Sequence, residues 1–265
     1  MSNLLTRALT GVVFVIVLTG AVWYNSASAA VLFLLIGIAG YPEYQKLTNT
    51  KSGNLAFGLY ATVVSLCWLL LYTHRFEWIS LLLATFFVLE LVQFIFTDRL
   101  NLSDLGKSIF GFIYLNLAFF ALYLIGFAHG SSYDPTPVLM VFFMVWANDT
   151  GAYLVGRALG KHKMIEKLSP KKTWEGTIGG IIIAGIMGFV LAKHVFDLNG
   201  VQYGIAGVIT GVGATLGDLF ESKLKRLSGV KDSGTLLPGH GGILDRFDAL
   251  YLAAPLNYIL LFWPF

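Results

Sequence analysis

Residues 218–248 read DLFESKLKRLSGVKDSGTLLPGHGGILDRFD, a dense polar stretch in a chain that is otherwise mostly apolar. The stretch holds four Asp, one Glu, five Lys or Arg and one His. A helix that begins near Val201 and continues past residue 218 presents positions i, i+3, i+4 and i+7 on one face. Here these positions are Asp218, Glu221, Ser222 and Lys225. The stretch therefore predicts a polar helical face where an apolar helix ends.

The rest of the stretch predicts a tight turn and a second pair of acids. Residues 238–242 read PGHGG, and glycine adopts positive φ without strain and lets backbone approach a ligand closely. Asp245 and Asp248 follow at i and i+3, where the next apolar helix starts, so they share a face. Mg²⁺ prefers carboxylate and phosphate oxygens, and Lys and Arg neutralise phosphate charge. This arrangement indicates a site for a metal-bound polyphosphate, and a loop whose bases only fix membrane topology is the alternative.

Composition predicts an integral membrane protein of the all-α class. Hydrophobic residues make up 56% of the 265 residues and charged residues only 12%, against roughly 25% in soluble domains. Mean hydropathy is +0.72. Windows of about 20 apolar residues mark membrane-spanning helices. We read nine spans: Leu9–Tyr24, Ala27–Gln45, Leu55–Tyr72, Trp78–Phe96, Ile109–Ala128, Pro137–Leu154, Trp174–Val195, Val201–Phe220 and Phe247–Phe265.

The distribution of basic residues predicts how these spans are oriented. If the N-terminus is cytoplasmic, only Arg75 and Lys193 of the 18 Lys and Arg residues fall in outer loops. Cytoplasmic loops of membrane proteins carry an excess of Lys and Arg. We therefore expect a cytoplasmic N-terminus, an outer C-terminus and a cytoplasmic location for both polar motif loops.

Chemically informative residues are concentrated in the second half of the chain. We expect residues 1–135 to form structural, lipid-facing transmembrane helices and residues 136–265 to form a catalytic region with cytoplasmic motif loops. In the first half, Glu43 lies near a helix end, which favours a structural or interfacial role over catalysis. Glu90 and Gln93 share a helical face at i and i+3, which favours hydrogen bonding between helices over lining a substrate cavity.

A second polar block lies at the sixth and seventh spans. Asp149 stands in an otherwise apolar helix, where a carboxylate is costly unless it is paired, solvated or bound to a cation. Lys171 and Lys172 precede Thr173 and Glu175, which suit a helix N-terminus, and such a terminus attracts anions. We expect a phosphate site here, with a lysine pair that binds lipid headgroups as the alternative. Small residues repeat every four positions after residue 176 and predict close helix packing.

Both blocks resemble one known family. The pattern Ser222-x-x-Lys225-Arg226-x4-Lys231-Asp232-x5-Pro238-Gly239-His240-Gly241-Gly242-x2-Asp245-Arg246-x-Asp248 resembles the signature of phosphatidate cytidylyltransferases, also called CDP-diacylglycerol synthases. Asn148-Asp149 and residues 169–176, SPKKTWEG, resemble that family's other signature block. The resemblance is specific from about residue 140 to 265, and before that it is only a hydrophobic pattern.

The resemblance implies that CTP and phosphatidic acid react to give CDP-diacylglycerol and pyrophosphate in phospholipid biosynthesis. It implies Mg²⁺ as cofactor, with K⁺ as a candidate second cation, and Asp218, Asp245 and Asp248 as metal ligands. The residues expected to act in catalysis are Asp218, Asp245, Lys225, Arg226 and His240. The residues expected to bind substrate are Lys171, Lys172, Ser222, Lys231, Arg246 and Asp149.

Three readings stay open beside this one. A related CTP-dependent enzyme acting on a polyprenyl or archaeal-type lipid, or a lipid kinase of similar build, shares this chemistry. An ion-coupled transporter is the rival from another class, but it should carry charged residues in both halves.

We expect a multi-pass protein of the inner membrane with its active site facing the cytoplasm. The bilayer is its environment, nucleic acid is not a partner, and a homodimer is an open expectation.

Overall fold

The computed structural model describes residues 3–50, 54–97, 100–236 and 241–262. Contacts divide the chain into two compact units, each built from two stretches of sequence. The first unit comprises Met1–Phe119 and Leu227–Asp245, and the second comprises Phe120–Arg226 and Arg246–Phe265. The polar stretch at residues 218–248 is therefore divided between the two units. The expected functional division at residues 135 and 136 stays a prediction.

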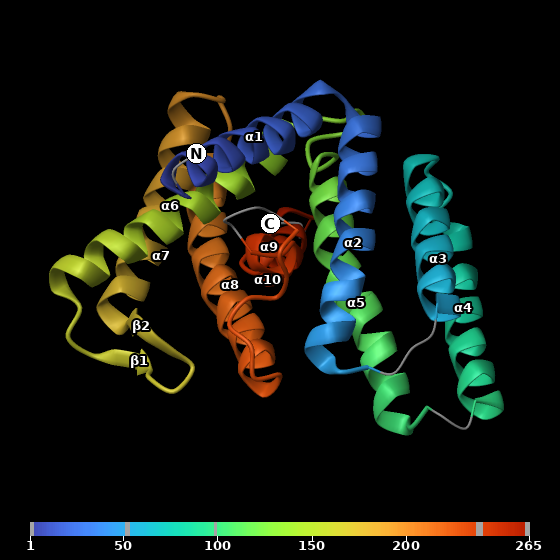
Figure 1. Ribbon diagram of the computed structural model, residues 1–265. Coiled ribbons are helices and arrows are strands. Elements are labelled where there is room, and N and C mark those ends of the chain that lie inside the picture. Colours follow the sequence, from blue (N-terminus) through green and yellow to red (C-terminus); the bar gives the residue numbers. More distant parts are fainter. Residues whose placement is uncertain (1–2, 51–53, 98–99, 237–240, 263–265) are drawn as a thin grey trace. The chain divides into compact units, whose positions relative to one another are not determined.

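The first unit is built from apolar helices (Figure 1). They are α1 (Asn3–Tyr24), α2 (Ser26–Thr48), α3 (Asn54–Tyr72), α4 (Glu77–Phe96) and the first part of α5 (Leu102–Ile125). Asn25 begins α2, because its side chain accepts a 2.8 Å hydrogen bond from the backbone N–H of Ser28 in a capping box. Asn49 ends α2 in the left-handed conformation, with a φ of 48°, which Asn tolerates better than most residues. These local signals set the extent of α2, the helix that carries Glu43.

A buried polar contact joins three helices inside the first unit. The hydroxyl of Tyr60 in α3 donates to the carbonyl of Gly37 in α2 and accepts from the amide of Asn116 in α5, at 3.0 Å each. The ring of Tyr60 stacks on Tyr41, with centroids 3.8 Å apart. Hydrogen bonds of this kind satisfy polar groups that would otherwise be unpaired among apolar side chains.

The second unit contains the remaining elements (Figure 1). They are the end of α5, α6 (Thr136–Leu159), β1 (Lys163–Ile165), β2 (Ser169–Thr173), α7 (Trp174–His194), α8 (Gly200–Leu227), the end of α9 (Leu244–Phe247) and α10 (Leu250–Phe262). α6 and α7 make the most extensive helix contact and lie side by side. Because α6 and α7 are joined only by the short β1–β2 segment, their polar ends stay close together.

Glycines let the helices of the second unit approach each other closely. A Cβ atom added to Gly180 in α7 would lie 2.6 Å from the carbonyl oxygen of Asn148 in α6. A Cβ atom at Gly213 in α8 would lie 2.7 Å from the Cα atom of Ala253 in α10, and Gly211 faces the backbone of α7 in the same way. The prediction that small residues serve close helix packing is confirmed.

The chain has the helices of a multi-pass membrane protein. Within the described residues, six helices are long and apolar enough to cross a membrane, namely α2, α4, α5, α6, α7 and α8. Shorter apolar segments cover Ala8–Tyr24 and Ala56–Tyr72, so eight of the expected spans correspond to apolar helices. The expected ninth span is divided, because α9 ends at Phe247 and α10 begins at Leu250. At this break the Asp248 carboxylate accepts a 2.7 Å hydrogen bond from the backbone N–H of residue 249, which competes with helical pairing.

The prediction of an all-α fold is incomplete at one place. The basic segment between α6 and α7 forms an antiparallel hairpin in which Lys163 pairs with Thr173 and Ile165 pairs with Ser169. The hairpin leads directly into α7, and the Thr173 side chain accepts a 3.2 Å hydrogen bond from the backbone N–H of Gly176. The predicted helix start at Thr173 is confirmed, and the motif loop that we expected before it contains a short two-stranded hairpin.

Candidate active site

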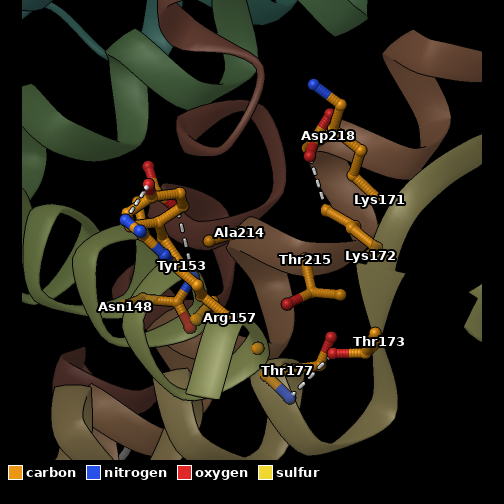
Figure 2. A pocket seen from close by; sticks show the side chains of 14 residues that line it. Asn148, Tyr153, Arg157, Lys171, Lys172, Thr173, Thr177, Ala214, Thr215 and Asp218 are labelled. Carbon is orange, nitrogen blue, oxygen red and sulfur yellow. Dashed lines mark hydrogen bonds and ion pairs between the residues drawn. The ribbon is translucent and has the colours of Figure 1, made fainter. Parts of the chain in front are cut away.

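A cavity of about 420 Å³ opens among α6, β2, α7 and α8 of the second unit (Figure 2). This volume falls within the range of small-molecule sites, roughly 300–1,000 Å³. Its lining combines two carboxylates, three basic side chains and several hydroxyl and amide groups. The lining residues are Asn148, Asp149, Ala152, Tyr153, Gly156, Arg157, Lys171, Lys172, Thr173, Gly176, Thr177, Ala214, Thr215 and Asp218.

One face of α6 supplies a row of polar groups to the cavity. Asp149, Tyr153 and Arg157 follow at intervals of four residues, which places them above one another on a helix. Asp149 is exposed to the cavity and accepts a 3.2 Å hydrogen bond from the Asn148 amide, while Arg157 donates to the Tyr153 hydroxyl at 3.3 Å. The charges of Asp218 and Lys172 both act on the Asp149 carboxylate. The row therefore carries negative charge at one end and positive charge at the other.

The central contact of the cavity is an ion pair between Lys172 and Asp218. The Lys172 ammonium lies 2.5 Å from Asp218 Oδ2, as the dashed line in Figure 2 shows. Lys172 sits near the end of β2 and Asp218 on α8, so the pair joins the hairpin to that helix. Their side chains are 25% and 34% exposed, which leaves both accessible from the cavity. Lys171 also lines the cavity and is exposed.

Glu175 fixes the hairpin that carries these lysines. Its carboxylate accepts hydrogen bonds of 3.1 and 3.2 Å from the backbone N–H groups of Lys161 and His162. It also lies 2.5 Å from Nδ1 of the His162 ring. The first turn of α7 thus holds the start of the hairpin, and we infer that Glu175 positions the hairpin.

The polar face of α8 forms as predicted, but its members have different surroundings. The Ser222 hydroxyl donates to Asp218 Oδ1 at 3.2 Å, so it orients that carboxylate. Lys225 lies 3.3 Å from Glu221, whose side chain is fully buried, and the pair follows the i, i+4 spacing. Arg226 is exposed at the end of the helix. Of this face, only Asp218 lines the cavity.

Asp248 adds a third carboxylate to the electrostatics of this region. The charges of Asp218, Asp149 and Lys225 all act on its side chain. A Cβ atom at Gly217 would overlap the carbonyl oxygen of Asp248, so glycine is what allows α8 to approach this point. Like charges at short range destabilise one another unless cations offset them. Carboxylate oxygens are also the type of donor that Mg²⁺ prefers, so the chemistry of these side chains suits a divalent cation.

Within the described residues, no three His, Cys, Asp or Glu side chains already converge closely enough to hold a metal ion. One oxygen of Asp218 is in contact with the Lys172 ammonium. The predicted metal ligands Asp218 and Asp248 lie in the same unit, whereas Asp245 belongs to the first unit, and its role as a ligand stays a prediction.

The other predicted residues that the structure describes lie outside the cavity lining. Asp245 Oδ2 accepts three hydrogen bonds of 2.9 Å, from the backbone and hydroxyl of Ser233 and from the backbone of Gly242. Lys231 of the first unit and Arg246 of the second are exposed. His240, with Pro238 and Gly239 of the same turn, lies outside the described residues.

Several cavity residues were not predicted from the sequence. Arg157, Thr177 and Thr215 line the cavity beside the predicted lysines and aspartates. Arg157 follows Asp149 by eight residues, two helical turns on the same face, so the α6 spacing contained a signal for it. The two threonines resemble ordinary hydroxyls of apolar helices in the sequence, and only packing brings them to the cavity.

Comparisons with known proteins identify the family to which the chain belongs. The cytidylyltransferase family matches residues 5–263 of the chain. A phosphatidate cytidylyltransferase of Brucella suis is 33% identical over 261 residues, which cover 98% of this chain and 93% of that protein. One of Staphylococcus haemolyticus is 40% identical over 191 residues, with 70% and 72% of the two chains covered. One of Haemophilus influenzae is 50% identical over 123 residues, or 44% and 43% of the two chains. The match over almost the whole length shows that the chain belongs to the cytidylyltransferase family.

Proposed function

We propose that this chain transfers the cytidylyl group of CTP to phosphatidate in the cavity of the second unit, releasing pyrophosphate. The observation that carries the proposal is the Lys172–Asp218 ion pair in a cavity that also contains Asp149, Lys171 and Arg157. A cavity with both cationic and carboxylate groups suits a reaction between two phosphates. Family membership and the activity for which the relatives are named agree with this chemistry.

The reaction needs charge compensation more than it needs a protein nucleophile. A phosphate oxygen of phosphatidate forms a bond to the α-phosphorus of CTP, and the bond from that phosphorus to the oxygen bridging to the β-phosphate breaks. The electron pair leaves with pyrophosphate. Because both reactants are anions, catalysis depends on positioning and on electrostatic stabilisation.

The basic cavity residues supply that stabilisation. Lys171, Lys172 and Arg157 bind and orient the phosphates, and arginine does so with a planar pair of donors. Ser222 holds the Asp218 carboxylate in place through its hydroxyl. Lys225, Arg226, Lys231, Arg246 and His240 stay proposed phosphate-binding or catalytic residues on the grounds of the sequence pattern.

We assign the cation-binding role to Asp218 and Asp248, with Asp149 beside them and Asp245 as the ligand proposed from the motif. When bound, Mg²⁺ lowers the repulsion between the phosphates and stabilises the departing pyrophosphate. Lys172, by pairing with Asp218, holds that carboxylate in its orientation. Activity should therefore disappear in excess EDTA and return on addition of Mg²⁺; full activity in EDTA would contradict the assignment.

The side of the membrane on which the site lies is proposed from the uneven distribution of Lys and Arg between the loops of the two sides. The hairpin and the loop after α8 face the cytoplasm, where CTP is found, and the N-terminus lies on the same side. Phosphatidate reaches the cavity from the bilayer, so only its headgroup needs a polar environment.

Membranes containing the protein and labelled CTP test the proposal with defined lipids. We expect labelled CDP-diacylglycerol when phosphatidate is supplied, and no labelled product with a polyprenyl phosphate. Product formed only from the polyprenyl phosphate would favour the related enzyme. No lipid product together with cation uptake into vesicles would favour a transporter. The Asp218→Asn variant is the matched control, because its product yield should fall to background.

A further inference from the structure

The loop between α8 and α9 is held by a carboxylate that the proposed chemistry does not use. Glu43 Oε1 in α2 accepts a hydrogen bond from the backbone N–H of Ile243, and Oε2 accepts from Leu244, at 3.0 Å each. Oε2 also lies 3.0 Å from the hydroxyl of Ser233. All these residues belong to the first unit, although Glu43 precedes the loop by about 190 positions in the sequence. One side chain thus holds two stretches of the loop, on both sides of residues 237–240.

Ser233 connects Glu43 to Asp245. Its hydroxyl lies 3.0 Å from Glu43 Oε2 and 2.9 Å from Asp245 Oδ2, and its side chain is buried. A hydroxyl carries one proton, so it can donate to only one of the two carboxylates at a time. The backbone N–H groups of Ser233 and Gly242 also donate to Asp245 Oδ2. The orientation of Asp245 is therefore set by the loop that Glu43 holds.

The glycines around this contact leave room for the Glu43 carboxylate to lie against the loop backbone. A Cβ atom at Gly242 would overlap Glu43 Oε2 and the Ser233 hydroxyl, and a Cβ atom at Gly234 would overlap Glu43 Oε1. Gly241 has a φ of 86°, a conformation that favours glycine. A second anchor lies one turn further along α2, where the Ser228 hydroxyl donates to the carbonyl of Leu47. The sequence alone suggested that the glycines of residues 238–242 approach a ligand, whereas Gly242 approaches Glu43, as does Gly234 outside that turn.

We propose that Glu43 is a positioning residue for the reaction: through Ser233 it fixes the orientation in which Asp245 serves the cation. The inference rests on the proposed role of Asp245 as a cation ligand. Partners that orient a metal ligand typically change metal affinity or activity by roughly 10- to 100-fold when they are removed. Glu43 is not among the residues that line the cavity, so its loss should change the Mg²⁺ requirement rather than lipid recognition.

Two variants test the inference, Glu43→Gln and Ser233→Ala, each compared with the purified full-length protein in detergent. We expect each variant to raise the Mg²⁺ concentration that gives half-maximal activity by about 10-fold. The KM for phosphatidate should stay within about twofold. The double variant should be little worse than either single variant, because both changes break one chain of contacts.

A second readout does not depend on activity. Hydrogen–deuterium exchange at the backbone amides of Ile243 and Leu244, measured without added metal, should be faster in Glu43→Gln than in the unmodified protein. Glu90→Gln is the matched control, since it changes another buried carboxylate of the first unit in a different helix. Its Mg²⁺ requirement and its exchange at residues 243 and 244 should stay unchanged. If Glu43→Gln does not fold, Ser233→Ala decides the question alone.

The possible failures are distinguishable. Unchanged exchange at residues 243 and 244 in Glu43→Gln would show that the contact does not hold the loop, and would overturn the inference. Faster exchange with an unchanged Mg²⁺ requirement would make Glu43 a purely structural anchor, and would also overturn it. Normal activity in Asp245→Asn would instead remove the proposed role of Asp245, whereas an inactive Asp245→Asn beside a normal Glu43→Gln would refute the inference alone.

Discussion

Lys172 is the basic side chain of the cavity that forms an ion pair with one of its carboxylates. It contacts Asp218 at 2.5 Å and stands next to Lys171, so one residue pairs with an acid and adds to the positive charge of the proposed phosphate-binding surface. A bare carboxylate in a partly buried cavity is costly, and an ammonium group at this distance offsets that cost. We therefore assign two effects to Lys172: it orients Asp218, and it attracts the nucleotide.

Replacing Lys172 by Ala should lower kcat/KM for CTP by about 100-fold, the scale of losing one electrostatic contact to a developing charge. Lys172→Arg should retain part of the activity, because it keeps the charge but changes its geometry. Steady-state assays with CTP as the varied substrate measure both. Lys167→Ala is the control, since Lys167 is exposed in the same hairpin and lies outside the cavity lining. Activity of Lys172→Ala within about twofold of normal would contradict the assigned role.

Among the secondary-structure elements, α6 and α7 are in close contact and both form part of the cavity wall. Both helices contribute lining residues, and glycines at their interface allow their backbones to meet. Inside a membrane, helices associate through such close packing rather than through exclusion of water. Small changes at this interface should therefore affect both stability and the cavity.

Gly180→Ala should destabilise the protein, because the added methyl group would lie 2.6 Å from the carbonyl oxygen of Asn148. Overpacking of this kind costs typically 1–3 kcal/mol, which should lower the midpoint of thermal unfolding in detergent by several degrees. Gly58→Ala is the matched control, because no atom lies within 4 Å of a Cβ atom added there. An unchanged midpoint for Gly180→Ala would show that the interface is looser than described.

The sequence predicted most elements but missed two features for identifiable reasons. The apolar helices follow from long hydrophobic runs, and the polar face of α8 follows from helical spacing. The hairpin was missed because β1 has three residues and β2 has five, and their lysines resemble a topogenic loop. The contact of Glu43 was missed because its partners are backbone N–H groups and a serine far away in the sequence, which leave no local pattern.

At the scale of the whole molecule, the chain forms two units, and the signature pattern contributes residues to each. Asp218 and Asp248 belong to the second unit, while Ser233 and Asp245 belong to the first. All the described residues that line the polar cavity belong to the second unit. The orientation of the molecule in the membrane is the whole-molecule property on which access to CTP depends.

Cysteine labelling should establish that orientation. Cys67 is buried and is the chain's one cysteine, so a Cys67→Ser protein gives a clean background. In intact cells, a membrane-impermeant thiol reagent should label Asp197→Cys, between α7 and α8, but should label Lys167→Cys in the hairpin only after the membrane is opened. The reverse pattern would place the cavity on the outer side, away from CTP.

The most direct test of the account is CDP-diacylglycerol formation by purified Asp218→Asn protein at saturating CTP, phosphatidate and Mg²⁺. Asp197→Asn serves as the control, because it makes the same chemical change in the same unit outside the cavity, at a φ of 53° that Asn accepts. We predict that Asp218→Asn loses at least about 100-fold in kcat while its thermal unfolding stays close to normal, and that Asp197→Asn keeps full activity. Turnover of Asp218→Asn within a few-fold of normal would show that this carboxylate does not hold the cation, and would contradict the account.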